Sequence, residues 1–349
     1  MEKTEMVRSL MRSGINRDTS LQIAGLSKNQ FYYQPKGGIR GRSKTTTTKW
    51  KNSQTSEIKY VNNEDVIKLI VQYKLDPDHA NWYKLICYNL QLNGFYINHK
   101  KVYRLMYQHL LLEDAPKKAT RNFVKYRKVS PIRPLQIIEM DIKYVYIEGQ
   151  NKHAFVLTIL DTFTRDVLFW TAGYSMKSEQ IKQSWEYIIA EYFQPRKIDL
   201  KNIIVEVRND NGRQFLADLI RNFFEENNIK QIFTKPYTPE ENGHIESFHS
   251  ILSEAIKSDV FLTLNELEDR LVKFYYCYKH FRSHSGTKGI PPSIFWMLFE
   301  LNYIEVISLK NNQYKIKLKV AYQDILSLPE ISKLISGNTV TGRKTFAFE

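Results

Sequence analysis

Cysteine is scarce in this sequence of 349 residues: only Cys87 and Cys277 occur, far apart and without the neighbouring Cys or His of a zinc site. This scarcity excludes a disulfide framework and favours a reducing compartment. The N-terminus lacks the apolar core of a signal peptide, and no stretch approaches the roughly 20 apolar residues of a membrane helix. We therefore expect a cytoplasmic protein with no membrane partner, in which both cysteines serve packing.

Acidic residues are few in the first third of the chain. Residues 1–135 carry 25 Lys and Arg against 10 Asp and Glu, whereas residues 136–349 carry 26 against 27. Basic side chains interleaved with Tyr and Phe neutralise phosphates and release counterions, so this third predicts a polyanionic partner. A basic protein that is merely soluble is the alternative.

The length exceeds one ordinary domain of ~100 to 200 residues, and we expect several folded units. Residues 1–35 predict a helix-turn-helix unit, whose short last helix follows Ser27 as its N-cap and presents Lys28 and Asn29. A three-helix packing element would give the same pattern. Residues 36–60 are rich in Gly and Thr and strongly basic, which predicts a flexible linker.

A second helical unit is predicted over residues 61–113, and its last helix begins after Asn98 with a basic outer side and an apolar base. A second basic linker covers residues 114–134 and ends in prolines. From residue 135 to 300 the pattern changes to three β-rich segments and then to alternating helices and strands, which predicts a mixed sheet with helices on its faces. Residues 301–349 form a C-terminal segment of unknown role with some β pattern.

Three acids of the predicted core occupy positions that suggest a functional role. Asp141 interrupts an apolar strand, where a carboxylate is costly without a partner. Asp210 opens the turn Asp210-Asn211-Gly212 after an apolar strand, at the edge where α/β sheets usually bind ligands. Glu246 lies one turn into a helix. Taken singly, Asp210 suits a simple Asp-Gly turn and Glu246 an exposed helical acid.

Three carboxylates on rigid elements suffice to hold two divalent cations ~3.5 to 4 Å apart for phosphodiester chemistry. Magnesium fits because it prefers oxygen ligands and keeps several waters. Periodicity alone does not bring these three residues together in space.

The motifs around the acids carry a resemblance. The segment Asp210-Asn211-Gly212-x-Gln214-Phe215, the 35 residues between Asp210 and Glu246, and Asn242-Gly243-His244-Ile245-Glu246 resemble the DDE core of bacterial insertion-sequence transposases and retroviral integrases. Glu139-Met140-Asp141-Ile142 resembles the family's first acid, which makes Asp161 on the next hairpin a structural residue. Tyr278-Lys279-His280-Phe281-Arg282-Ser283-His284 resembles the segment that closes the core.

The sequence also departs from the family. Ile138 stands where the family often has Trp, and Lys279 stands where it often has Asn. Seven residues after its catalytic Glu the family often has Lys or Arg, whereas this chain has Ser253, and Lys257 lies one turn further on. The zinc-binding domain of the retroviral kind is missing. The likeness extends over about residues 64–300.

The resemblance implies an RNase H-like core in which Asp141, Asp210 and Glu246 are catalytic and bind two Mg²⁺ ions, for which Mn²⁺ can substitute. It implies a DNA transposase that cleaves the 3′ ends of a mobile element by hydrolysis and joins them by transesterification. The expected partners are double-stranded DNA, as terminal inverted repeats and as target, and further copies of the chain, as a homodimer or higher oligomer in a synaptic complex. A catalytically silent DNA-binding regulator and a nuclease that cuts without joining are the alternatives.

Basic residues in the recognition units and linkers are the expected DNA contacts. They are Lys28, Asn29, Arg40, Arg42, Lys100, Lys101, Arg104, Lys117, Lys118, Arg121, Lys125, Arg127, Lys128 and Lys257.

Overall fold

The structure is a computed structural model of the whole chain. It describes residues 3–33, 45–113, 130–198, 200, 203–234, 242–309 and 313–337. The chain forms two compact units, Met1–Thr45 and Thr46–Glu349. None of the described helices is both long enough and apolar enough to cross a membrane.

The first unit is a small helical bundle with the elements α1 (Lys3–Arg12), α2 (Arg17–Ala24) and α3 (Lys28–Phe31). Its core consists of Val7, Leu21 and Ala24. Ser27 accepts a hydrogen bond from the Gln30 backbone N–H, and the Gln30 side chain accepts one from the Ser27 N–H, a reciprocal cap that fixes the start of α3. The predicted helices of this unit are thus present.

The second unit begins with a β-hairpin, β1 (Thr47–Lys51) and β2 (Ile58–Asn62). The prediction of a flexible linker over residues 36–60 is wrong here, because Trp50 and Val61 are buried and join the core of the following helices. The Trp50 indole donates to the Asn93 carbonyl at 2.8 Å. One large anchor therefore orders a segment whose composition is polar. Residues 36–44 of that predicted linker lie outside the described residues.

Three helices complete this part of the fold: α4 (Asn63–Leu75), α5 (Tyr83–Leu92) and α6 (His99–Gln108). The backbone between α5 and α6 passes so close to the hairpin that a Cβ on Gly94 would stand 2.1 Å from the Lys51 carbonyl oxygen. Gly94 also has a φ of +89°, which favours glycine. The hairpin and the helices thus pack as one body.

The centre of the unit is a five-stranded mixed sheet in the order β5-β4-β3-β6-β7. Its strands are β3 (Ile137–Ile147), β4 (Lys152–Asp161), β5 (Val167–Gly173), β6 (Val205–Asn209) and β7 (Ile229–Phe233). The first three are antiparallel, whereas β6 and β7 run parallel to β3. An N-terminal helical region followed by this core confirms the predicted fold class.

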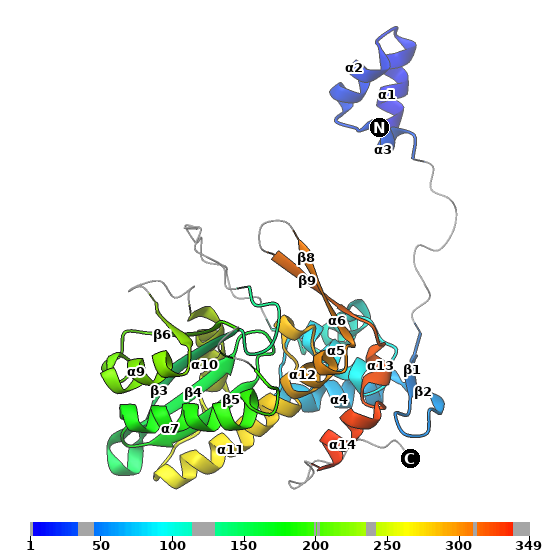
Figure 1. Cartoon of the computed structure of the whole chain (residues 1–349). Helices are drawn as coiled ribbons and strands as arrows, with labels where there is room; N and C mark the ends of the chain where they lie inside the picture. Colours follow the sequence, from blue (N-terminus) through cyan, green and yellow to red (C-terminus); the bar gives the residue numbers. More distant parts are fainter. Residues whose placement is uncertain are drawn as a thin grey trace. The chain divides into compact units, whose positions relative to one another are not determined.

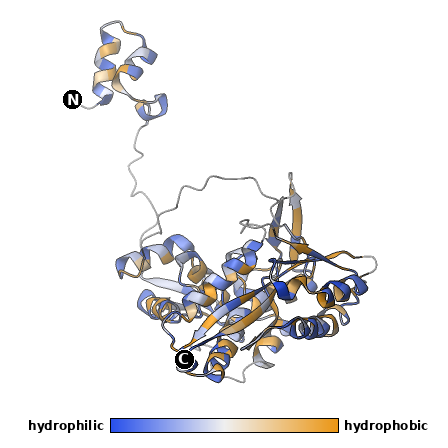
Figure 2. Ribbon diagram, turned by 90° about the vertical axis from the view of Figure 1, so that its left-hand side faces the viewer, coloured by the Kyte–Doolittle hydropathy of each residue, from blue (hydrophilic) through white to orange (hydrophobic). Residues whose placement is uncertain are grey.

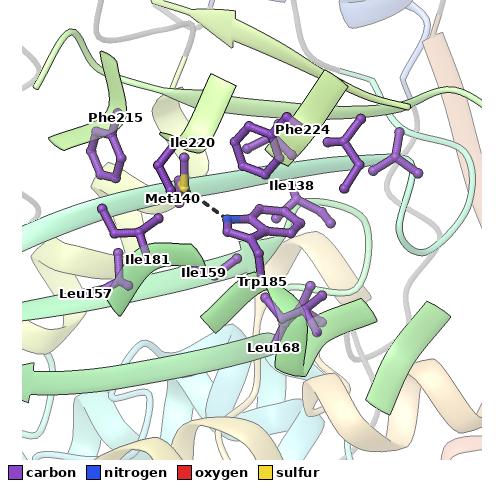
Figure 3. Close-up of a cluster of buried hydrophobic side chains, with 14 of the residues drawn as sticks. Ile138, Met140, Leu157, Ile159, Leu168, Ile181, Trp185, Phe215, Ile220 and Phe224 are labelled. Carbon is purple, nitrogen blue, oxygen red and sulfur yellow. Dashed lines mark hydrogen bonds between the residues drawn. The ribbon is translucent and has the colours of Figure 1, made fainter. Parts of the chain in front are cut away.

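Helices cover both faces of the sheet (Figure 1). On one face, α7 (Ser178–Ile188) and α9 (Asp218–Glu226) enclose a core around Trp185, whose indole N–H points at the Met140 sulfur at 3.4 Å (Figure 3). On the other, α10 (Gly243–Ala255) and α11 (Leu264–His280) cover the second core. The helices carry both hydrophobic and hydrophilic residues, as expected of elements with one buried side (Figure 2).

The helical part of the second unit is docked on α11 through charged groups. Two guanidinium nitrogens of Arg270 bind the two carboxylate oxygens of Asp78 at 2.7 and 3.3 Å, and its Nε binds Asp259 at 2.9 Å. Arg282 Nη1 donates to the Asp78 carbonyl at 2.7 Å. The turn between α4 and α5 is therefore fixed to the sheet-bearing part.

The described residues that follow α12 (Pro292–Glu300) pack on it. They contribute the hairpin β8 (Ile304–Leu309) and β9 (Gln313–Leu318) and the helices α13 (Tyr322–Ile325) and α14 (Pro329–Gly337). The small C-terminal β segment expected from the sequence is present.

Candidate active site

Asp141 lies on β3, and Asp210 directly follows the neighbouring strand β6. In the parallel pair β3 and β6, Glu139 is opposite Arg208. Asp141 lies two residues beyond Glu139, and Asp210 lies two beyond Arg208, directly after β6 ends. The two carboxylates are therefore carried to the same level of adjacent strands.

The strand period decides which face these acids occupy. Ile138, Met140 and Ile142 of β3 belong to the core under α7 and α9, whereas Val145 and Ile147 belong to the core under α10 and α11. Because side chains alternate along a strand, Asp141 shares the α10 side.

Asp141 interacts electrostatically with Asp210. Partial burial raises the pKa of Asp210 above its ordinary value, and the negative charge of Asp141 raises it further. A hydrogen bond from the Gly212 N–H, at 2.9 Å, acts in the opposite direction. The structure thus holds two like charges close together, which favours a cation between them.

Asp141 also touches α10. Its Oδ2 lies 3.2 Å from Nδ1 of His249, and its Oδ1 accepts the Ile142 N–H at 2.8 Å. Sequence reasoning missed His249. Its place one turn after Glu246, on the same side of a helix, was the available signal.

Glu139 fixes the start of α10 to β3. This fully buried carboxylate accepts the backbone N–H groups of His244 at 3.0 Å and Ile245 at 2.8 Å, and its other oxygen lies 2.8 Å from His244 Nδ1. Sequence reasoning missed this residue too, although an acid inside an apolar strand was the signal that singled out Asp141. The helix that carries Glu246 is anchored two residues from the first acid.

Glu246 is exposed in the first turn of α10. Within the described ranges no group of three or more acids, histidines or cysteines has the arrangement of a metal site. The structure therefore brings Asp141 and Asp210 together and places Glu246 on the adjoining helix. The catalytic triad remains a prediction.

Asp161 serves the turn between β4 and β5. It is fully buried, and its carboxylate accepts the Leu135 N–H at 2.8 Å and both the N–H and hydroxyl of Thr164 at 2.7 and 2.6 Å. Burial raises its pKa to about 6 despite these bonds. These contacts suit the structural role that the sequence suggested.

Lys279, which departs from the motif that the sequence resembles, has a local explanation. Its ammonium lies 3.1 Å from the buried Asp166 carboxylate and 3.3 Å from the Tyr192 hydroxyl. An amide could not neutralise that acid. The departure from the family pattern thus goes with a buried ion pair.

The predicted DNA contacts fall into three groups. Lys28, Asn29, Lys100 and Lys257 are exposed. Arg104 is half-buried, as is Lys101, whose ammonium donates to the Thr47 carbonyl at 2.7 Å and so helps to hold the hairpin. The others lie outside the described residues: Arg40, Arg42, Lys117, Lys118, Arg121, Lys125, Arg127 and Lys128.

Comparison with known proteins identifies the core. Residues 131–239 and 227–292 each match a family described as "Integrase core domain". No curated protein matches the chain.

Several solved structures are similar in part. A chain of the simian T-cell lymphotropic virus intasome is 16% identical, with a TM-score of 0.37 over 54% of this chain. This chain spans 63% of the length of that one. The BIV integrase catalytic core is 19% identical, with a TM-score of 0.36, and the match covers 48% of this chain and 97% of that one. The catalytic domain of Mos1 mariner transposase is 13% identical, with a TM-score of 0.36, and the match covers 47% of this chain and 74% of that one.

The two matched segments together run from residue 131 to 292, over the sheet, both aspartates and α10. The part of the chain that carries the sheet and α10 therefore contains an integrase core domain.

Proposed function

We propose that the protein is a DNA transposase that binds the terminal inverted repeats of a mobile element, cleaves its 3′ ends and joins them to target DNA. The observation that carries this proposal is the pairing of Asp141 and Asp210 on adjacent strands of an integrase core domain, below a helix fixed to the same strand.

Glu246 completes the proposed site. His249 contacts Asp141, and Glu246 precedes His249 by three residues on α10. Side chains three apart on a helix are neighbours, so Glu246 stands on the side of α10 that faces the aspartates. The proposed site thus takes its three carboxylates from β3, from the residue after β6 and from the first turn of α10.

The residues fit divalent cations because their donors are carboxylate oxygens and because the charge of Asp141 already raises the pKa of Asp210. Two Mg²⁺ ions, or Mn²⁺ in their place, would activate the attacking oxygen and stabilise the leaving one. Asp141, Asp210 and Glu246 would act as ligands and would take no covalent part.

The reaction has two steps of the same kind. Water attacks the phosphorus at the element's end and displaces the 3′ oxygen, which leaves a free 3′ hydroxyl. That hydroxyl then attacks a phosphorus of the target and displaces its 3′ oxygen, so one phosphodiester bond forms as another breaks. The protein must therefore hold two DNA segments in line at one site, which suits a multimer of this chain.

A strand-transfer assay tests the proposal. Purified protein, Mg²⁺ and a labelled duplex that carries the candidate terminal repeats should yield 3′ nicks and then joined products. Parallel reactions in EDTA provide the blank. Nicking without joining would favour a nuclease, whereas DNA binding without nicking in Mg²⁺ or Mn²⁺ would favour a silent regulator and overturn the proposal.

A further inference from the structure

A cavity of about 270 Å³ lies beside the start of α10. Gly243, His244 and Ser247 of α10 line one side, and Arg282 and His284, which follow α11, line another. Arg165, from the turn between β4 and β5, lines it as well. The cavity therefore lies at the start of the helix that carries Glu246.

Arg165 is partly buried and forms no ion pair with another described residue. Its Nη1 atom is inaccessible to solvent and has no hydrogen-bond partner among the described residues. Burial lowers its pKa below the ordinary value, yet a guanidinium stays charged at neutral pH. Leaving such a group unpaired is costly, so an anionic partner is expected.

The nearest acids are already engaged. Glu139 and Asp161 attract Arg165 electrostatically, but neither lies within ion-pair distance of it in the described structure. Glu139 accepts the first N–H groups of α10 and contacts the His244 ring, and Asp161 holds its own turn. Neither carboxylate therefore serves as the anionic partner of Arg165.

Arg282 adds a second desolvated guanidinium. Its Nη1 donates to the Asp78 carbonyl, a neutral acceptor, and burial lowers its pKa. His284 adds no charge, because burial first, and then the guanidinium of Arg282, lowers its pKa to about 3. The positive charge of the lining thus comes from Arg165 and Arg282. The nearby Glu139 carboxylate is already bound by the first residues of α10.

The size and chemistry of the cavity define its ligand. Arginine forks match the oxygens of a phosphate. A volume of about 270 Å³ is large enough for one phosphate group and part of its sugar.

We propose that this cavity binds a backbone phosphate of the DNA strand that enters the active site, with Arg165 and Arg282 as its cationic donors. The inference rests on the proposed function. It adds DNA contacts within the core. The DNA contacts expected from the sequence lie in the basic first third, apart from Lys257.

Equilibrium binding in EDTA tests it apart from catalysis. Phosphate contacts are independent of sequence, so a fluorescein-labelled duplex of about 30 base pairs serves as probe. Arg165→Gln and Arg282→Gln should each weaken binding several-fold and reduce the slope of log K against log salt by about 0.9. Arg221→Gln, which changes an exposed arginine on α9 paired with Asp218, is the matched control and should bind as wild type.

Gly286→Asp tests the same site in a way that a folding defect of the Gln variants cannot explain, because it keeps Arg165 and gives it a carboxylate partner. A Cβ on Gly286 would stand 2.8 Å from Arg165 Nε, so a short carboxylate there reaches the guanidinium. This variant should melt at a higher temperature than wild type and bind the duplex more weakly. A lower melting temperature with unchanged binding would overturn the proposal.

Inorganic phosphate separates the two sources of the anion. If it competes with the duplex in wild type and not in Arg165→Gln, the cavity takes a DNA phosphate. If phosphate raises the melting temperature while duplex affinity and salt slope are the same in all variants, the site holds a free anion and the proposal is wrong. Wild-type binding without nicking would instead contradict only the proposed function.

Discussion

Glu139 holds His244 at two points, through the backbone N–H at 3.0 Å and the ring Nδ1 at 2.8 Å. The contact joins the strand of Asp141 to the helix of Glu246. We expect Glu139→Ala to leave buried donors unsatisfied, at about 1–3 kcal/mol each. A shift of ~1 Å in α10 would reduce nicking on the order of 100-fold.

Single-turnover nicking and urea unfolding would measure both effects. Glu139→Gln keeps one acceptor oxygen for the two N–H groups and should lose much less activity than Glu139→Ala. Duplex binding should persist in both. Equal activity of the Ala variant and wild type would show that Glu139 does not position the helix.

The Arg270 clamp should set how firmly the helical part holds to α11. Arg270→Gln removes the paired contact with Asp78 and leaves two carboxylates without their guanidinium, at a cost of about 3–5 kcal/mol. Hydrogen exchange should become faster in α4, α5 and the turn between them. If only peptides of α11 lost protection, docking would depend on other contacts.

Lys279 and Asp166 should behave as one unit. Lys279→Met leaves the almost fully buried Asp166 unpaired and should cost about 3–5 kcal/mol of unfolding free energy. Asp166→Asn combined with Lys279→Met should recover a large part of that loss, because no buried charge then remains. Urea unfolding of wild type, the two single variants and the double variant gives the coupling energy between Lys279 and Asp166. If the effects of the two single changes simply add, the two residues do not act as a unit.

His284 should make stability fall in weak acid. Its pKa in the folded protein is lowered to about 3, mainly by burial, against an ordinary value near 6.5. As pH falls through 6.5 the unfolded chain binds a proton that the folded protein excludes, so stability present above pH 6.5 is lost. Between pH 7 and 5 this loss is roughly 2 kcal/mol.

Comparing wild type with His284→Asn isolates this contribution, since His280, whose pKa burial lowers to about 4, titrates in both proteins. Urea unfolding at the two pH values should show a smaller fall in the variant. An equal fall in both proteins would show that His284 is protonated in the fold or does not contribute.

Local patterns predicted most of the core. Alternating β-branched and aromatic residues located β3, β4 and β5, and apolar periodicity located the helices, because each signal arises from one buried face. The backbone of Ala217 leaves helical geometry and separates α9 from the short helix α8 (Arg213–Leu216), a break that apolar periodicity does not show. The hairpin at residues 47–62 escaped prediction because only two of its apolar residues, Trp50 and Val61, belong to the buried core, and the rest of the stretch is mostly polar.

Contacts between distant residues could not be predicted. Asp78 and Arg270 are 192 residues apart, and Glu139 and His244 are 105 apart. A single sequence shows that a buried acid needs a partner but does not say which. The pairing of Asp141 with Asp210 was expected from a family resemblance, and its geometric basis, the register of β3 against β6, appears only in the fold.

The central claim is that Asp141, Asp210 and Glu246 together support metal-dependent cleavage. The most direct measurement is nicking of a labelled terminal-repeat duplex by Asp141→Asn, Asp210→Asn and Glu246→Gln in Mg²⁺ and in Mn²⁺, with duplex affinity measured alongside. Asp218→Asn, an exposed acid of α9, is the control. We predict that each of the three variants binds the duplex but does not nick it, whereas the control nicks at the wild-type rate. Nicking at the wild-type rate by any of the three would contradict the account.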